Sequence, residues 1–359
     1  ARYAGSKDRR AVADLVYDCL RRRRSLAWAS GAEGGRGLLH GLAAAEGWPL
    51  DAVFSGEGHA PGPLTEDEKS AGRGAPPDPV RYDHPDWLEA PLKASLGDAY
   101  AAAMAAMAAR APVDLRVNRL KTDRDGALAA LAEDGVEAAP LAEPDAIRCP
   151  PGARVAASSA FRDGLVELQD AASQAVARAA APRPGDAILD YCAGGGGKAL
   201  AFASLTAEGG VQRARVVAHD VEPKRMADIP ARAARAGARI EVAGGAALAA
   251  MGAVFDLVFV DAPCSGSGSW RRDPEGKWRL TETRFAELIE TQREAFRAAR
   301  AFLRPGGRIA YATCSQLDAE NRGQTAFLLR SDAGLSLIDE RAFRTDQGAD
   351  GLYVALFAT

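Results

Sequence analysis

The sequence has no apolar run near the roughly 20 residues that a membrane-spanning helix needs. Its first ten residues are basic with no apolar stretch behind them, so we expect no signal peptide. The five cysteines are an odd number at wide spacing, which excludes a disulfide framework, and no two have the spacing of zinc ligands. We therefore expect a cytoplasmic protein with reduced thiols, and neither a metal nor a membrane as partner.

The sequence also lacks a basic excess, because 45 Lys and Arg stand against 48 Asp and Glu, for a net charge of −3. Proteins that bind nucleic acid are often basic overall, so this balance argues weakly against that class. Positive charge is nevertheless gathered in clusters at residues 21–24, 116–124 and 271–279. A solvated face is the simple interpretation of each cluster alone. The third cluster is less ordinary, because it directly follows a cysteine loop.

Residues 188–198 indicate a strand that runs into a glycine-rich turn and a helix. The turn is not a Walker loop, because Lys198 is followed by Ala199, and its glycine spacing is not that of a dinucleotide fingerprint. Asp220 ends the next strand, about 20 residues later, where a ribose hydroxyl acceptor is expected. It also fits the N-cap of a helix from residue 222. Together these features suit a nucleoside-bearing cofactor such as S-adenosylmethionine.

Strands and helices alternate from about residue 165, which predicts a Rossmann-like, doubly wound parallel α/β sheet. The expected strands are residues 187–191, 215–219, 239–242, 256–260, 307–312 and 352–358, and the expected helices include residues 222–236 and 281–303. We expect three regions: a helical region at 1–75, a small α+β module at 80–160, and the sheet domain at 161–359.

Two strands are each expected to deliver a thiol to the carboxyl edge of this sheet, where ligands bind in open α/β folds. Cys264 lies in residues 258–266 and Cys314 in residues 308–315, each in a Cys-Ser dipeptide after an apolar run. Buried cysteines are most often inert, and we keep that interpretation for Cys19 and Cys149. For the first pair we favour covalent catalysis with one thiol as nucleophile.

Asp261 stands three residues before Cys264, at the polar end of an apolar strand. A thiolate that adds to carbon 6 of a pyrimidine makes carbon 5 nucleophilic enough to attack a methyl sulfonium. A carboxylic acid at ring nitrogen 3 assists this addition, and Asp261 is placed to supply it. A second thiol nearby would help to release the product.

These motifs resemble the RsmB/Sun-type RNA cytosine-5 methyltransferases. The resemblance is carried by Asp261-Ala-Pro-Cys-Ser-Gly-Ser-Gly, by residues 271–278, and by Tyr311-Ala-Thr-Cys-Ser with Glu320-Asn321 behind it. Residues 163–174 resemble the segment before the family's cofactor loop, and the similarity extends over about residues 80–359. Residues 6–28 resemble a shortened part of the NusB-like helical domain of the bacterial RsmB branch.

The resemblance implies that Cys314 is the nucleophile, that Cys264 assists product release and that Asp261 contacts the cytosine. It implies a pocket for S-adenosylmethionine made of Cys192, Ala193, Gly194, Gly195, Gly196, Gly197, Lys198, Asp220, Val221, Arg225 and Asp261. Arg271, Arg272 and Lys277 would contact RNA phosphates.

Two departures from the family pattern affect the cofactor pocket. The family's usual Cys-Ala-Ala-Pro-Gly-Gly-Lys-Thr is replaced by the glycine run of residues 192–199. The acidic residue that usually follows the third strand is also missing, because residues 242–247 contain no carboxylate.

The sequence therefore predicts a monomeric methyltransferase that acts on an unpaired or flipped cytosine, in small-subunit ribosomal RNA rather than transfer RNA. Transfer RNA stays open as the target. A second hypothesis is a non-catalytic RNA-binding ribosome-assembly factor on the same fold. A third is a DNA cytosine methyltransferase, against which the second thiol in Thr-Cys-Ser argues.

Overall fold

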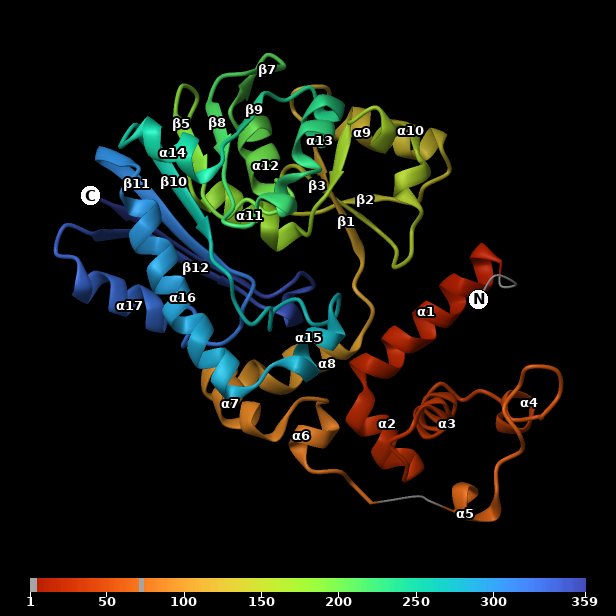
Figure 1. The fold of residues 1–359 in the computed structure, drawn as a ribbon. Coiled ribbons are helices and arrows are strands. Elements are labelled where there is room, and N and C mark those ends of the chain that lie inside the picture. The colour runs from red at the N-terminus through yellow and green to blue at the C-terminus, as the bar shows by residue number, and fades with distance from the viewer. Residues whose placement is uncertain (1–4, 71–73) are drawn as a thin grey trace. The chain divides into compact units, whose positions relative to one another are not determined.

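The computed structural model describes residues 5–70 and 74–359, and its chain forms two compact units (Figure 1). The first unit comprises Ala1–Arg110 and Ser269–Leu280, and the second comprises Ala111–Gly268 and Thr281–Thr359. This division differs from the three expected ranges. Residues 80–110 of the expected α+β module, and a segment from inside the expected sheet domain, belong to the first unit. In the described part of the chain, no helix is both long and apolar enough to cross a membrane.

The first unit is helical. Its helices are α1 (Ser6–Arg21), α2 (Arg23–Ser30), α3 (Gly35–Ala45), α4 (Leu50–Val53), α5 (Glu66–Lys69), α6 (Asp78–Arg81), α7 (Glu89–Leu96), α8 (Tyr100–Ala108) and α15 (Pro274–Arg279). Helices α2 and α3 pack closely at Gly41, where a Cβ atom would lie 2.3 Å from the carbonyl oxygen of Leu26. Helix α1 lies in the helical region expected at 1–75, and its apolar residues Val12 and Val16 are 59% and 51% exposed.

The segment that contains α15 packs against the carboxyl end of α1 within this unit. Lys277 Nζ donates to the carbonyl of Arg21 at 3.1 Å, and Trp278 Nε1 donates to the carbonyl of Leu20 at 2.7 Å. In return, Arg21 Nε donates to the carbonyl of Arg271 at 2.8 Å. These bonds satisfy carbonyls that the end of a helix leaves without intrahelical partners.

The second unit begins with a small antiparallel sheet in the order β2-β3-β1-β4. Its strands are β1 (Val113–Val117), β2 (Ala139–Pro140), β3 (Ala146–Cys149) and β4 (Val166–Leu168), and helices α9 (Arg124–Glu133) and α10 (Ser159–Arg162) accompany them. Leu115 and Val117 pack with Leu131 and Ile147 in a core that also buries Cys149.

The large sheet has seven strands in the order β12-β13-β11-β10-β5-β8-β9. They are β5 (Ala187–Asp190), β8 (Arg215–Ala218), β9 (Ile240–Val242), β10 (Phe255–Asp261), β11 (Leu303–Thr313), β12 (Ser336–Phe343) and β13 (Leu352–Ala358). Strands β9, β8, β5, β10 and β11 are parallel, and β13 runs antiparallel between β11 and β12. The expected doubly wound sheet is confirmed, as is the final strand.

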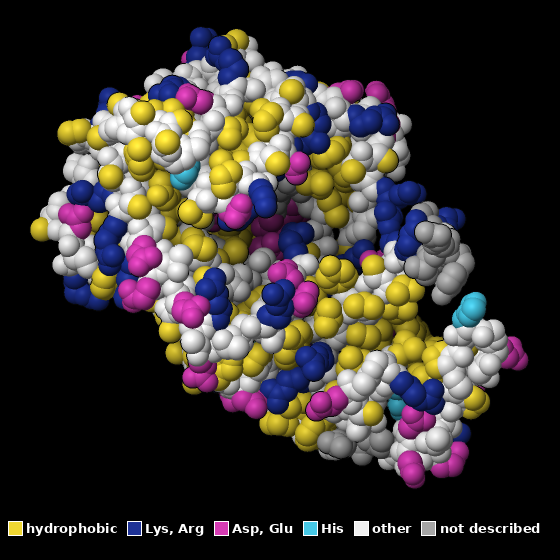
Figure 2. All heavy atoms as spheres, in the orientation of Figure 1, with side chains coloured by type: hydrophobic (Ala, Val, Ile, Leu, Met, Phe, Trp, Pro, Cys, Tyr) yellow, Lys and Arg dark blue, Asp and Glu magenta, His cyan; other side chains and the backbone are white. Residues whose placement is uncertain are grey.

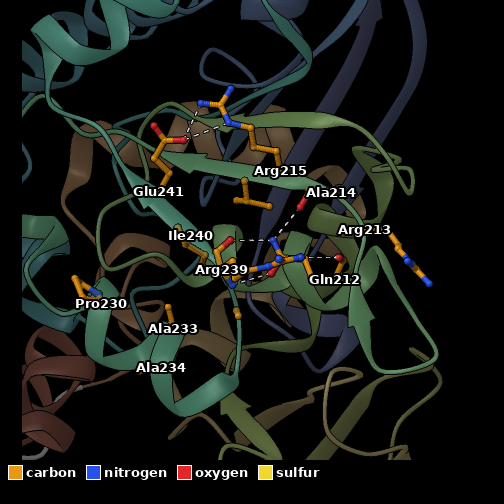
Figure 3. Close-up of a pocket in the computed structure, with 12 residues that line it drawn as sticks. Gln212, Arg213, Ala214, Arg215, Pro230, Ala233, Ala234, Arg239, Ile240 and Glu241 are labelled. Carbon is orange, nitrogen blue, oxygen red and sulfur yellow. Dashed lines mark hydrogen bonds and ion pairs between the residues drawn. The ribbon is translucent and has the colours of Figure 1, made fainter.

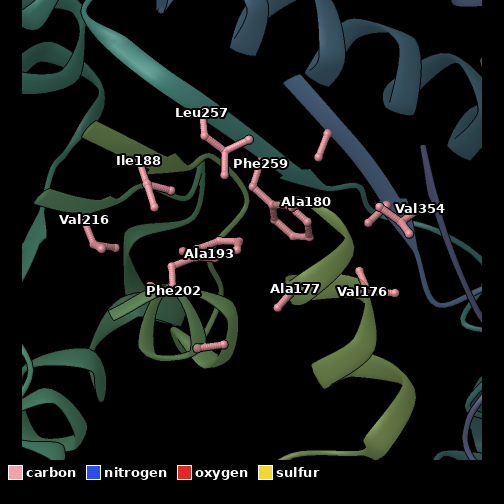
Figure 4. Packing of buried hydrophobic residues seen from close by; sticks show 14 of the residues in the cluster. Val176, Ala177, Ala180, Ile188, Ala193, Phe202, Val216, Leu257, Phe259 and Val354 are labelled. Atoms are coloured by element: carbon pink, nitrogen blue, oxygen red, sulfur yellow. The ribbon is translucent and has the colours of Figure 1, made fainter. Parts of the chain in front are cut away.

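Helices cover both faces of this sheet. They are α11 (Ala171–Ala179), α12 (Gly197–Leu205), α13 (Ile229–Ala236), α14 (Gly245–Met251), α16 (Glu282–Arg300) and α17 (Arg322–Ser331), and a small ribbon of β6 (Ala207–Glu208) and β7 (Val211–Gln212) lies beside them. Ile188, Leu257 and Phe259 point toward α11 and α12 (Figure 4). The alternate residues Leu189 and Val258 join the core that contains Phe296 of α16. The central strands are apolar throughout because both of their faces are buried.

Candidate active site

Polar side chains lie at the carboxyl ends of four neighbouring parallel strands. Asp190 ends β5 and Asp261 ends β10, while Asp220 comes two residues after β8 and Cys314 directly after β11. These strands are adjacent in the order β11-β10-β5-β8. The fold thus brings to one sheet edge groups that are more than 120 residues apart in the sequence, at the place where open α/β sheets bind ligands.

The glycine-rich turn after β5 needs at least two of its glycines. Gly194 has a φ of +50° and Gly196 a φ of +79°, both in the left-handed region that side chains disfavour. Gly196 is the N-cap of α12, and a Cβ there would lie 2.8 Å from Cγ1 of Ile229. The turn therefore brings bare backbone to the start of α12, where amide groups without intrahelical partners are available to a ligand.

Asp220 is tied to this turn. Its Oδ2 accepts a hydrogen bond of 2.9 Å from the amide of Gly194 and lies 3.2 Å from Arg225 Nη1. Its Oδ1 accepts from the amide of Glu222 at 3.0 Å, so it stabilises the turn after β8 but is not the N-cap of a helix from residue 222. The next residue, Val221, is 92% exposed although it lies beside this buried carboxylate. Its side chain is therefore available for a ligand to cover.

A buried cation links the turn to β10. Lys198, in the first turn of α12, donates from Nζ to Asp261 Oδ2 at 3.0 Å. Burial by itself would lower the pKa of Lys198, but the adjacent charges of Asp261 and Asp190 outweigh it and raise the pKa. Cys314 is also close enough to interact with this ammonium group. A cation here favours negative charge on the neighbouring sulfur.

Asp190, which sequence reasoning missed, is fully buried under the glycine turn. Neither carboxylate oxygen makes a hydrogen bond of ordinary geometry within the described residues, although the amide of Ala199 is near enough to favour the charged form. Burial, and then the charge of Asp261, raises the pKa of Asp190 to about 7. A carboxylate without a full set of partners would be compensated by a cationic ligand.

The two thiols predicted to act together are in contact. Cys264 Sγ and Cys314 Sγ lie 3.3 Å apart, and either can donate to the other. The hydrogen bond to Cys314, followed by burial, raises the pKa of Cys264 well above its ordinary value, so this sulfur stays protonated. The Cys264 loop is also fastened to the strand end by the Gly268 amide, which donates to the Cys314 carbonyl at 2.9 Å.

A buried polar network surrounds the two thiols. Glu320 accepts hydrogen bonds at Oε1 from the amide of Ser265 at 2.8 Å and from Gln292 Nε2 at 2.9 Å. Gln292 Nε2 also donates to the carbonyl of Pro263 at 3.1 Å. Sequence reasoning noted Glu320 only as part of a motif and missed Gln292, because nothing local indicates that α16 faces this loop.

The predicted phosphate contacts are placed differently from expectation. Lys277 is 2% exposed with its ammonium group on α1, and Arg271 is 4% exposed. Buried side chains are not available to an RNA backbone, so the structure argues against this role for both. Of the three predicted phosphate contacts, only Arg272 is exposed. A run of charges suggested a solvated face, but Arg271, before α15, and Lys277, within it, are both buried.

The region after the third parallel strand contains no carboxylate, as the sequence indicated. Strand β9 leads to buried Ala243 and to Gly244, the N-cap of α14, whose Cβ position has nothing within 4 Å. The carbonyl of Ala243 is 2.9 Å from His219 Nδ1. This stretch therefore offers no carboxylate to accept a hydrogen bond from an adenine amine.

A cavity elsewhere on the second unit lacks the groups of this site. A cavity of about 730 Å³ between β8, β9 and α13 contains an ion pair of Arg215 and Glu241 at 2.7 Å, but no thiol and none of the glycine turn (Figure 3). On the face shown in Figure 2, basic and acidic side chains are interspersed. Across the described ranges, no three His, Cys, Asp or Glu are grouped to hold a metal ion.

The arrangement fits S-adenosylmethionine. The glycine turn brings backbone to the start of α12, Asp190 is a buried carboxylate that a cationic group would compensate, and Asp220 with exposed Val221 lies beside the turn. The two thiols and Asp261 lie on the neighbouring strand ends.

Comparison with known proteins agrees with this geometry. The family model described as 16S rRNA methyltransferase RsmB/F matches residues 177–355, and that of the ferredoxin-like domain of RsmF/B-like methyltransferases matches residues 84–155. Ribosomal RNA small subunit methyltransferase B of Sodalis glossinidius is 38% identical over 278 residues, which are 76% of this chain and 62% of that protein. The Salmonella typhi protein of the same name is 38% identical over 264 residues, or 72% and 60% of the two chains.

Solved structures share the fold. The crystal structure of PH0851 has a TM-score of 0.77 at 22% identity and covers 99% of this chain and 91% of its own. The structure of NSun6 from Pyrococcus horikoshii with SFG has a TM-score of 0.67 at 19% identity and covers 76% of this chain and 98% of its own. The chain spans about 60% of the length of the curated relatives it matches.

Proposed function

The chain belongs to the RsmB/F methyltransferase family, and from that premise we propose that it transfers a methyl group from S-adenosylmethionine to carbon 5 of a cytosine in RNA. The observation that carries the proposal is the contact between Cys264 and Cys314 beside Asp261, on the sheet edge where the glycine turn ends. Two adjacent thiols and a carboxyl group are what addition to a pyrimidine ring and its reversal require.

Cys314 is the nucleophile in this proposal. As a thiolate it adds to carbon 6 of the cytosine, and the electron pair displaced onto carbon 5 forms the new bond to the methyl group. S-adenosylmethionine, when bound, supplies that methyl group as an electrophile. The nearby ammonium group of Lys198 supports this role, because a fixed positive charge stabilises the thiolate.

Asp261 orients the base and Lys198 holds Asp261. The carboxyl group faces ring nitrogen 3 and the exocyclic amine of the cytosine, where a hydrogen bond withdraws electron density during addition. Asp261 is about one-third exposed while Lys198 is buried, so the pair presents its acidic member to the substrate.

Cys264 acts in product release. After transfer, carbon 5 gives its proton to water, the carbon 5–carbon 6 double bond re-forms, and the electrons of the carbon 6–sulfur bond return to Cys314. The raised pKa of Cys264 supports its role as a thiol that donates to the departing sulfur 3.3 Å away, rather than as a base. Removal of this thiol leaves the covalent adduct without an acid for its breakdown.

The cofactor is assigned to the glycine turn and its neighbours. In this assignment Gly194 to Gly197 and Lys198 line the amino-acid end, with Cys192 and Ala193 leading into the turn. Asp220 takes the ribose hydroxyls, and Val221 and Arg225 cover the nucleoside. The exposure of Val221 and the tie between Asp220 and Gly194 support this orientation.

The proposed partner is small-subunit ribosomal RNA, with the target cytosine unpaired or flipped out of a helix. The names of the relatives support ribosomal over transfer RNA. Arg272 is the proposed phosphate contact of the third basic cluster. We further propose that the protein acts as a monomer in the cytoplasm, where its thiols stay reduced.

One observation favours a second candidate function. The absence of a carboxylate after β9 removes an acceptor for an adenine amine, which would suit an RNA-binding ribosome-assembly factor that has lost methyl transfer. The contact of both thiols argues for retained catalysis, because an assembly factor has no use for it.

The test is methyl transfer from labelled S-adenosylmethionine to unmodified ribosomal RNA, with wild type, Cys314→Ala and Cys264→Ala compared. We expect label on carbon 5 of cytosine with wild type, none with Cys314→Ala, and RNA trapped covalently on Cys264→Ala. Transfer RNA and single-stranded DNA serve as competing substrates. Absence of transfer to any RNA by the wild type would favour the assembly-factor function.

A further inference from the structure

The serines of the two Cys-Ser dipeptides share one partner. Ser265 follows Cys264, and Ser315 follows Cys314. The hydroxyl groups of both serines donate to the carboxylate of Glu320, which lies just before α17. A single buried side chain therefore contacts the neighbour of each thiol, although the two dipeptides are 50 residues apart.

This carboxylate clamps the Cys264 loop on both sides of the thiol. The amide of Ser265 donates to Glu320 Oε1 at 2.8 Å, and Gln292, bonded to the same oxygen, holds the Pro263 carbonyl at 3.1 Å. The residues before and after Cys264 are thus fixed by one pair of side chains. Glu320 itself is 0% exposed.

The two thiols depend on this clamp to different degrees. Cys314 directly follows Thr313, which pairs with Tyr353 of β13, so the sheet already sets its position. Cys264 lies in a segment between β10 and α15 without helix or strand, so besides the backbone bond from Gly268 to Cys314 its position rests on side-chain contacts. Loss of the clamp moves Cys264 more than Cys314.

We propose that Glu320 is a positioning residue for product release: through Ser265 and Gln292 it holds the Cys264 thiol against the sulfur of Cys314. This inference rests on the proposed function and assigns a role to a residue that touches neither substrate nor cofactor. Burying a carboxyl group is costly, and burial raises the pKa of Glu320 while hydrogen bonds from Ser265 and Ser315 partly lower it. A site that needed only to fill space would not require an acid here.

The test separates methyl transfer from release in Glu320→Gln and Ser265→Ala. Single-turnover methyl transfer is followed with labelled S-adenosylmethionine, and the RNA–protein adduct is measured on denaturing gels. We expect transfer within about twofold of wild type and release slowed roughly tenfold or more, so that adduct accumulates as with Cys264→Ala. Ser265→Ala keeps the carboxylate but removes the hydroxyl that bonds Glu320, the Ser267 amide and Ser315, and it serves if Glu320→Gln does not fold.

Thr325→Val is the matched control. Thr325 is buried in α17 and hydrogen-bonds Tyr353, but contacts neither cysteine loop. It should lose stability without accumulating adduct. Parallel loss of transfer and release in Glu320→Gln and Ser265→Ala, or an unchanged adduct level, would overturn the inference. Failure of the wild type to methylate RNA would instead overturn the proposed function.

Discussion

The buried carboxyl group of Asp190 lowers the stability of the folded protein. Its pKa is raised to about 7 from an unfolded value near 3.9. Between those values the unfolded chain ionises freely while the folded chain does not, so stability falls as pH rises from about 4 to 7 and stays reduced above. Asp190 therefore destabilises the unliganded protein at neutral pH.

Asp190→Asn should therefore stabilise the protein without ligand. At pH 8 we expect a gain of roughly 1 to 4 kcal/mol in the free energy of unfolding, disappearing near pH 4. Urea unfolding of both proteins at pH 4, 6 and 8 measures it. Equal stability of both proteins at every pH would mean that Asp190 is not a buried charge. The same variant should bind S-adenosylmethionine more weakly.

Gly164 tests a backbone contact at the residue scale. Its φ is +72° and a Cβ there would lie 2.0 Å from the carbonyl oxygen of Arg235, whereas Gly135 has a φ of +68° with nothing within 4 Å of its Cβ position. Gly135→Ala should cost about 1–2 kcal/mol for the left-handed backbone alone. Gly164→Ala should cost at least about 3 kcal/mol because the clash is added. Similar melting temperatures for the two variants would contradict this.

At the scale of elements, the segment that contains α15 buries two of the three basic residues expected to bind RNA, Arg271 and Lys277, and exposes Arg272. Arg272→Ala should weaken RNA binding and reduce the slope of log affinity against log salt by about 1. Lys277→Met should leave that slope unchanged, because its ammonium group lies on α1. The variant should still fold, since burial already lowers the pKa of Lys277 to about 8. Filter binding at several salt concentrations distinguishes the two variants. A reduced slope for Lys277→Met would show that Lys277 contacts RNA.

The elements also explain what the sequence could predict. The central parallel strands are continuous apolar runs, so each was expected near its observed place. Strand β12 was missed because it is an edge strand, mostly exposed, with a bulge between Leu337 and Asp339. The helix expected at 222–236 is divided into a 3-10 turn at Pro223–Met226 and α13, each of which has a proline among its first two residues.

The residues of the candidate site also divide into those that the sequence could predict and those that it could not. Cys264, Cys314, Asp261 and Asp220 all follow strands, and topology alone brings strand ends together. Glu320 and Gln292 come from a loop and a helix face whose directions depend on packing, which no local pattern encodes. The charged run at 271–279 gave a wrong prediction of RNA contacts for a related reason, because a short helix such as α15 buries one of its faces.

At the scale of the whole molecule, cofactor binding should be visible as stability. Free S-adenosylmethionine at 100 times its dissociation constant stabilises a protein by about 2.7 kcal/mol if only the folded form binds it. We expect the melting temperature to rise with donor concentration in the wild type and not in Asp220→Ala. A flat response in the wild type would favour the assembly-factor function.

The contact of the two sulfurs has a further consequence for where this molecule can work. Thiols at 3.3 Å need little movement to become a disulfide, and peroxide would convert the pair with the release of two molecules of water. Treated protein should lose about two mass units and its methyl transfer activity together, and dithiothreitol should restore both. Cys264→Ala should show no such reversible mass change. An enzyme whose nucleophilic thiol lies beside a second thiol therefore has an activity that depends on the redox state of its surroundings.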